Sequence, residues 1–137
     1  MKNIIGLGLL AGVFMLIATT LLSMGLHSIF PSLQVEMANQ HVYRPMNSPL
    51  MTIFYLYPFI LGIALAWVWE RVKKEFKGKL FKRAVCFGLA YLLVVGLPGM
   101  FITYTSMQVS LLMISSWLLG GFVNGIVSGL TFAKWNK

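Results

Sequence analysis

Residues able to bind a metal or transfer a proton are scarce in this chain, and several of them lie in one polar segment, residues 27–49. His27, Glu36 and His41 supply its imidazole and carboxylate groups, and methionines lie on either side of them. Imidazole and thioether ligands together suit copper, above all the cuprous ion. The spacing disfavours such a site, because Glu36 and His41 are five residues apart rather than the three or four that align side chains on a helix. We therefore predict solvated loop residues, with no metal, cofactor or catalytic group.

Asp, Glu, Lys, Arg and His are missing from the four long apolar stretches of the sequence, which cover about residues 4–26, 50–69, 84–104 and 109–133. Pumps and antiporters normally carry protons or ions on Asp, Glu, Lys, Arg or His side chains at membrane depth. Their absence from these stretches argues against coupled transport. The acidic residues outside segment 27–49 lie among lysines, and each has a lysine four positions later. This spacing is typical of ion pairs that stabilise a helix.

Asn124 is the most polar side chain within an apolar stretch, about midway along the last one. An unpaired amide in hydrocarbon costs several kcal/mol, so Asn124 requires partners. One interpretation is a hydrogen bond to a Ser, Thr or Tyr hydroxyl of a neighbouring helix, which contributes about 0.6 kcal/mol on average. The other is a polar contact on a permeation path, within a stripe made of Ser116, Gly120, Asn124 and Ser128.

Small residues recur every four positions, which places them on one face of a helix. The strongest case is the last apolar stretch, with Gly121, Gly125 and Gly129. The first stretch repeats the pattern at Gly8 and Gly12, and the second at Gly62 and Ala66. Small side chains let two helix backbones approach closely, so these positions are predicted to be helix-packing sites. The pattern does not identify the partner, which is either another helix of the same chain or a helix of an oligomer.

Composition places these residues in a membrane. Of the 137 residues, 58% are hydrophobic and 10% charged, whereas soluble domains carry about 25% charged residues. A span needs roughly 20 apolar residues, and the four stretches satisfy this. We predict an all-α integral membrane protein, a four-transmembrane-helix antiparallel bundle that forms one domain over residues 1–137. A cleaved signal peptide is the rival interpretation of the first stretch, but it exceeds a typical apolar core and no cleavage signal follows it.

The connections between the spans suggest how they pair. Residues 27–49 form the only long loop, within which Leu33 and Met37 share one face of a possible short helix opened by Pro31. Pro58 is expected to bend the second span, whose ends carry tyrosines and the tryptophans Trp67 and Trp69, as in aromatic belts. A short uncharged linker joins the last two spans, which are expected to form the tightest antiparallel pair.

Basic residues concentrate between the second and third spans, in residues 70–83. This loop contains seven of the eleven basic residues, namely Arg71, Lys73, Lys74, Lys77, Lys79, Lys82 and Arg83. Basic flanks stay in the cytoplasm, and of all Lys and Arg only Arg44 falls on the opposite side of the four spans. Both termini are therefore predicted to be cytoplasmic and residues 27–49 external. The loop is expected to continue the second span as an amphipathic helix towards Gly78, with lysines facing anionic lipid head groups rather than nucleic acid.

Taken together, these patterns predict a non-enzymatic protein of a bacterial inner (plasma) membrane. An accessory or assembly subunit that acts through helix packing fits the absence of catalytic and relay groups. Its partners would be the anionic bilayer surface, and either a second copy or another membrane protein. The alternative is a small oligomeric channel or passive transporter lined by the polar stripe of the last span. The single Cys86 permits no intrachain disulfide and is expected to be a buried apolar residue.

Overall fold

The computed structural model describes residues 3–45 and 47–136, and within them it contains helices and no strands. The helices are α1 (Ile4–Ile29), α2 (Pro31–Met37), α3 (Pro49–Phe54), α4 (Tyr57–Val72), α5 (Leu80–Tyr91), the π-helical turn η1 (Leu92–Gly96), α6 (Leu97–Ser106) and α7 (Leu111–Trp135). They make four helical stretches that are long and apolar enough to cross a membrane, Ile4–Ile29, Pro49–Val72, Leu80–Ser106 and Leu111–Trp135. The predicted all-α four-helix bundle is confirmed, and each predicted span overlaps one stretch with ends that differ by at most four residues.

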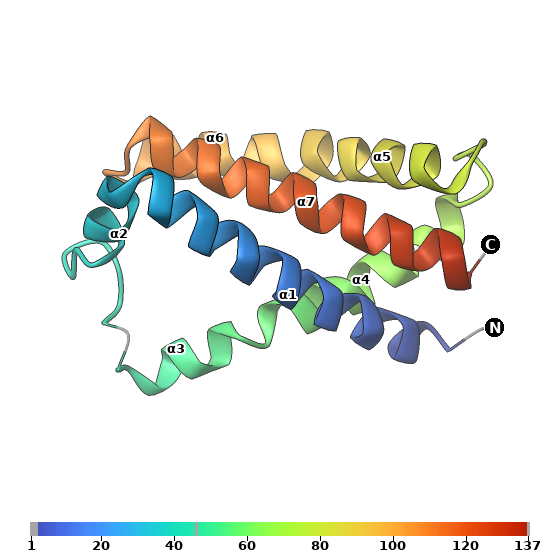
Figure 1. The fold of residues 1–137 in the computed structure, drawn as a ribbon, viewed down its shortest axis with the longest axis horizontal. Coiled ribbons are helices and arrows are strands. Elements are labelled where there is room, and N and C mark those ends of the chain that lie inside the picture. Colours follow the sequence, from blue (N-terminus) through green and yellow to red (C-terminus); the bar gives the residue numbers. More distant parts are fainter. Residues whose placement is uncertain (1–2, 46, 137) are drawn as a thin grey trace.

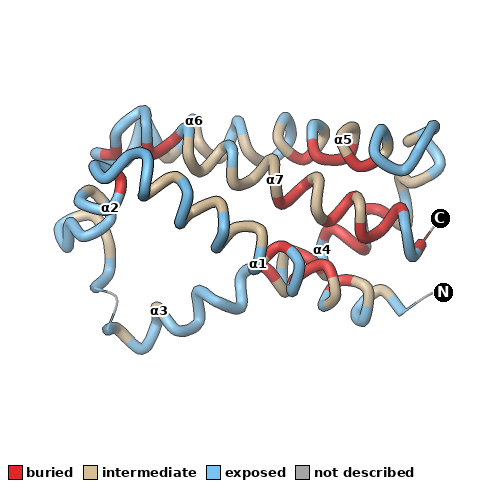
Figure 2. The backbone as a smooth tube through the Cα atoms, viewed as in Figure 1, coloured by how far each residue is buried: buried red, intermediate tan, exposed pale blue. Residues whose placement is uncertain are grey.

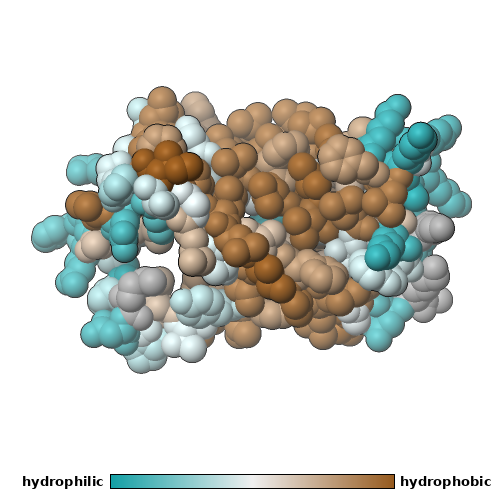
Figure 3. All heavy atoms as spheres, viewed as in Figure 1, coloured by the Kyte–Doolittle hydropathy of each residue, from teal (hydrophilic) through white to brown (hydrophobic). Residues whose placement is uncertain are grey.

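The four stretches run up and down between two ends of the molecule (Figure 1). One end, here called the basic end, holds both described chain ends and the connection between α4 and α5. The other end, here called the loop end, holds α2 and the turn between α6 and α7. A continuous apolar belt separates these polar ends on the face shown in Figure 3. That distribution is the one expected of a protein whose middle lies in hydrocarbon.

The second stretch is broken into two helices by Pro58. A proline ring clashes with the carbonyl of the residue four positions earlier and removes one backbone donor. That earlier residue is Phe54, and α3 ends there; α4 then starts at Tyr57 with Pro58 in its first turn. The expected bend is thus a break in the helix, after which α3 and α4 follow different directions (Figure 1).

The third stretch remains helical throughout but changes its winding. Its middle, η1, is a π-helical turn that directly precedes α6, whose first turn contains Pro98. Such turns are usually single insertions within α-helices, and they accommodate a displaced hydrogen bond. The π-helical turn therefore divides the third stretch into α5, which buries Ala84, Phe87, Gly88 and Tyr91, and α6, which buries none of its residues.

The connection between α4 and α5 differs from the prediction. The amphipathic helix expected to continue past residue 72 is wrong, because α4 ends at Val72 and residues 73–79 form turns. Gly78 has φ +113°, a conformation that side-chain-bearing residues rarely adopt. The chain reverses there, so that α5 returns into the bundle beside α7.

Buried residues concentrate in the half of the bundle nearer the basic end (Figure 2). There α1 packs along α4, α5 packs along α7, and α1 also contacts α7. The pair α1–α4 is as extensive as α5–α7, so the last two spans are not the single tightest pair that was expected. A smaller buried group at the loop end consists of Leu33 from α2 with Val109, Met113 and Ile114.

Candidate functional site

Glycines make the two main helix contacts of the bundle. The first glycine seam joins α1 to α4 and consists of Gly8, Gly12 and Gly62. A Cβ at Gly8 would lie 2.7 Å from the Ile63 nitrogen, and one at Gly12 would lie 2.9 Å from the Phe59 Cα. Real Cβ atoms essentially never lie within 3.0 Å of such backbone atoms, so a larger residue would push the helices apart.

The second glycine seam joins α5 to α7 and consists of Gly88, Gly125 and Gly129, with Ala84 opposite Gly129. A Cβ at Gly125 would lie 2.8 Å from the Gly88 Cα, and one at Gly129 would lie 2.9 Å from the Ala84 Cα. Gly121 lies at the margin, because its Cβ would meet only Tyr91 at an ordinary 3.6 Å. Gly88 was not singled out from the sequence, although Ala84 and Gly88 show the same four-residue spacing.

Asn124 lies inside the bundle, where its side-chain oxygen accepts a hydrogen bond of 2.8 Å from the Thr19 hydroxyl. Only 6% of its surface is exposed. The bond links α7 to α1, the two helices that are first and last in the chain. Other members of the polar stripe bond within their own helix, since Ser116 donates to the Met113 carbonyl and Ser128 to the Gly125 carbonyl. Gly120 is the open member, with no atom within 4 Å of its Cβ position.

An aromatic cluster fills the basic end, formed by Trp69, Phe76, Phe87 and Phe132. Trp69 is fully buried at its centre, with ring centroids 5.2 Å from Phe87 and 6.0 Å from both Phe76 and Phe132. The cluster joins α4, α5, α7 and the turn that carries Phe76. Aromatic pairs of this geometry contribute about 0.5–1.5 kcal/mol beyond their buried area. Trp69, which its position at a span end suggested as a belt residue, is a core residue.

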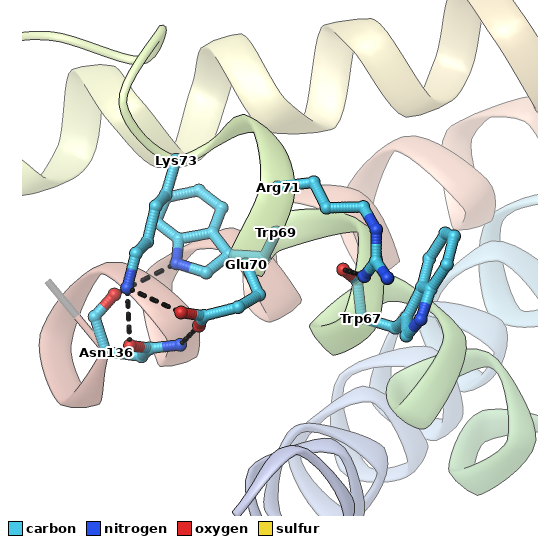
Figure 4. Close-up of polar contacts among 6 residues, drawn as sticks. All are labelled: Trp67, Trp69, Glu70, Arg71, Lys73 and Asn136. Atoms are coloured by element: carbon cyan, nitrogen blue, oxygen red, sulfur yellow. Dashed lines mark hydrogen bonds and ion pairs between the residues drawn. The ribbon is translucent and has the colours of Figure 1, made fainter. Parts of the chain in front are cut away.

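Polar contacts close the cluster on its outer side (Figure 4). The Trp69 indole N–H donates to the Asn136 backbone carbonyl at 3.0 Å. The Asn136 side chain accepts from the Lys73 ammonium at 3.0 Å and donates to the Glu70 carboxylate, and Lys73 and Glu70 also form an ion pair at 3.1 Å. The oxygen and the nitrogen of the Asn136 side-chain amide thus each bond to a charged group. Hydrogen bonds to charged groups are stronger than those between neutral groups. Sequence reasoning did not identify this network, because Glu70 and Asn136 are far apart along the chain.

The seven basic residues of segment 70–83 fall into two groups. Arg71 lies over the Trp67 ring at 3.3 Å, Arg83 over the Trp69 ring at 5.1 Å, and Lys73 belongs to the Asn136 network. The remaining four are exposed, namely Lys74, Lys77, Lys79 and Lys82. The structure therefore divides the loop into cations that hold the chain together and cations that face outwards.

At the loop end, Glu36 caps the start of α7. Its two carboxylate oxygens accept the Ser110 backbone N–H at 2.7 Å and the Ser110 hydroxyl at 2.6 Å, while the Ser110 oxygen accepts the Met113 N–H at 3.1 Å. The first N–H groups of a helix lack partners within it, and the positive end of the helix dipole favours an anion there. Glu36, considered above as a metal ligand, is therefore engaged in joining α2 to α7. Within the described residues, no cluster of three His, Cys, Asp or Glu side chains could hold a metal ion.

Tyr43 packs beside this cap. Its ring meets Trp117 of α7 edge-on, with centroids 6.3 Å apart. Burial, and secondarily the negative charge of Glu36, raises the pKa of the Tyr43 phenol above its usual value. The phenol hydroxyl is enclosed without a hydrogen-bond partner among the described residues. Glu36 and Tyr43 thus attach segment 27–49 to α7, while most of its described residues, His41 among them, are exposed.

Comparisons with known proteins give no relative for this arrangement: no protein family, curated protein or solved structure matches the chain. The fold and its four apolar helical stretches indicate a membrane protein.

Proposed function

We propose that this chain is a non-enzymatic accessory or assembly subunit of a bacterial inner membrane that acts through helix packing, with both termini in the cytoplasm. The observation that supports it most directly is the use of the polar groups at membrane depth. Asn124 bonds to Thr19, and Ser116 and Ser128 bond to carbonyls of α7. Groups committed to contacts within the chain are poor ligands for a passing solute.

The two glycine seams support the same proposal. They occupy the small-residue faces of α1, α4, α5 and α7 within one copy of the chain, so these faces contribute to the stability of the bundle itself. A second protein would then meet the bulky apolar surface of the remaining helices. The helices α3 and α6 expose apolar side chains such as Phe54 and Phe101. The surface of the partner protein that meets them would therefore be apolar, like the middle of a membrane helix.

The second candidate is a small oligomeric channel or passive transporter. One observation favours it, since Gly120 of the polar stripe has open space beside it. In an oligomeric channel, the side of α7 that carries Gly120 would have to line the permeation path. The candidates differ in oligomeric state and in flux.

The test is purification in mild detergent, mass determination and identification of bound proteins. The subunit proposal expects one copy of the chain together with a larger membrane protein, and no solute flux after reconstitution into vesicles. A defined homo-oligomer with measurable flux would contradict it. Reporter fusions test the orientation: fusions after Gly78 and at the chain end at Lys137 should report cytoplasm, whereas a fusion at Asn39 should report the outside.

A further inference from the structure

A groove runs between α1 and α7 in the half nearer the basic end. Its volume is about 440 Å³, and α1 contributes one wall with Phe14, Ile17, Ala18 and Leu21. The other wall comes from α7, and Leu80 at the start of α5 completes the lining. Both walls belong to helices that are long and apolar enough to cross a membrane, so the groove would face hydrocarbon.

The lining is nonpolar, with Lys134 as its one charged member. Thr131 also lines the groove, but its hydroxyl donates to the Val127 carbonyl at 2.8 Å. No lining hydroxyl is therefore left to hold water, and an apolar occupant suits the walls. The lining extends over about two turns of each helix, residues 14–21 on α1 and 127–135 on α7, and a hydrocarbon chain can lie along such walls.

The mouth of the groove carries positive charge. The Lys134 ammonium lies 4.6 Å from the centre of the Trp135 ring, and within the described part of the chain it forms no ion pair with a carboxylate. Trp135 also stacks on Phe14, with centroids 6.1 Å apart, so an amphipathic ring marks the same level. Lysine and tryptophan together are typical of the membrane interface. Lys79, one of the exposed cations, directly precedes the lining residue Leu80.

From these features we infer that the α1–α7 groove is a binding site for an anionic phospholipid. One acyl chain lies along the apolar walls, and the head-group phosphate contacts Lys134. The bilayer is the source of this ligand, since the groove would face its hydrocarbon. The site is independent of the proposed subunit role.

Native mass spectrometry of the delipidated protein tests the site. Phosphatidylglycerol and phosphatidylcholine with identical acyl chains are added at equal concentrations, and the bound fraction of each is measured. The wild type should prefer phosphatidylglycerol by about fivefold, the factor for one lysine near an anionic surface. Lys134→Gln should remove that preference, while Lys77→Gln, an equal charge change at an exposed position away from the groove, should keep it.

Two variants test the walls. Ala18→Phe fills the groove, and Leu21→Trp narrows it from a position that is 64% exposed and therefore tolerant of a larger side chain. Both should reduce the binding of both lipids while helicity and thermal unfolding remain those of a folded protein. The inference is overturned if Leu21→Trp binds both lipids as the wild type does, or if Lys77→Gln loses as much preference as Lys134→Gln. It is also overturned if the wild type has the mass of a dimer and the groove-filling variants have the mass of a monomer, because the groove would then hold a second copy of the chain.

Discussion

At the basic end, the aromatic cluster joins three helices around a fully buried Trp69, whereas at the loop end α3 and α6 contribute no buried residue. The glycine seams also lie nearer the basic end, where backbones come into direct contact. The loop end relies on the Glu36 cap and on the contact of Tyr43 with Trp117 of α7. Since lipid is as apolar as a side chain, helices associate where small residues allow close packing. The comparison indicates that stability is concentrated in one half of the bundle.

Trp69→Ala should have the largest effect. It removes a fully buried indole and its bond to Asn136, and such truncations cost about 3–5 kcal/mol. Trp67→Ala is the matched control, since Trp67 is two residues away and 50% exposed. The free energy of unfolding in micelles, measured by denaturant titration, should fall sharply for the first variant alone. Equal losses would show that the aromatic cluster does not dominate the basic end.

Gly125→Leu should rank second. The new side chain would collide with the Gly88 backbone, and overpacking of this kind costs about 1–3 kcal/mol. Gly120→Leu adds the same atoms to the same helix where no atom lies within 4 Å, and it should leave unfolding nearly unchanged. Thermal unfolding of the two variants decides the matter, and wild-type stability of Gly125→Leu would remove the close-packing argument.

Glu36→Gln should have a smaller and more local effect at the loop end. The amide keeps the volume but loses the charge that faces Ser110 and the start of α7, a change worth about 1 kcal/mol at helix caps. Amide hydrogen exchange should accelerate in residues 110–114 and stay unchanged in the second glycine seam. Glu75→Gln, an exposed position, is the control. Uniform acceleration along α7 would mean that the two halves are not independent.

Asn124→Leu should have the smallest effect. It removes the bond from Thr19 at nearly constant volume, and bonds of this type average about 0.6 kcal/mol. A double-mutant cycle with Thr19→Val should recover that value as the coupling between α1 and α7. Assembly should persist, and neither wild type nor variant should pass solute in vesicles. Flux that the wild type shows and Asn124→Leu abolishes would favour the channel candidate.

The four spans could be predicted from sequence because length and composition nearly decide a membrane helix. The small-residue spacing likewise pointed to Gly8, Gly12, Gly62, Gly125 and Gly129, all of which lie in the seams. Spacing fixes a helix face but not its partner, so Gly88 was missed and Gly121 was given the same weight as Gly125. Pro58 predicted a bend, but whether a proline bends or breaks a helix depends on how neighbours satisfy the freed carbonyl.

The polar contacts could not be predicted in the same way. Glu36 and Ser110 are separated by 74 positions, and Asn136 lies 66 from Glu70. No local periodicity connects such residues, because their proximity follows from how the helices are stacked. Trp69 illustrates the same limit, since a tryptophan at a span end serves equally well as a belt residue and as a core residue.

The pairing of the helices also bears on how the chain enters a membrane. Each glycine seam joins spans that are neighbours in the sequence, α1 with α4 and α5 with α7. Two hairpins can therefore close as soon as each is synthesised, and both closures span fewer residues than the contact between α1 and α7. The contacts that join the two hairpins, chiefly α1–α7 with the Thr19–Asn124 bond, form only after the last span has been made. The order of synthesis and the order of packing then coincide, and docking of the two finished hairpins is the last step of folding.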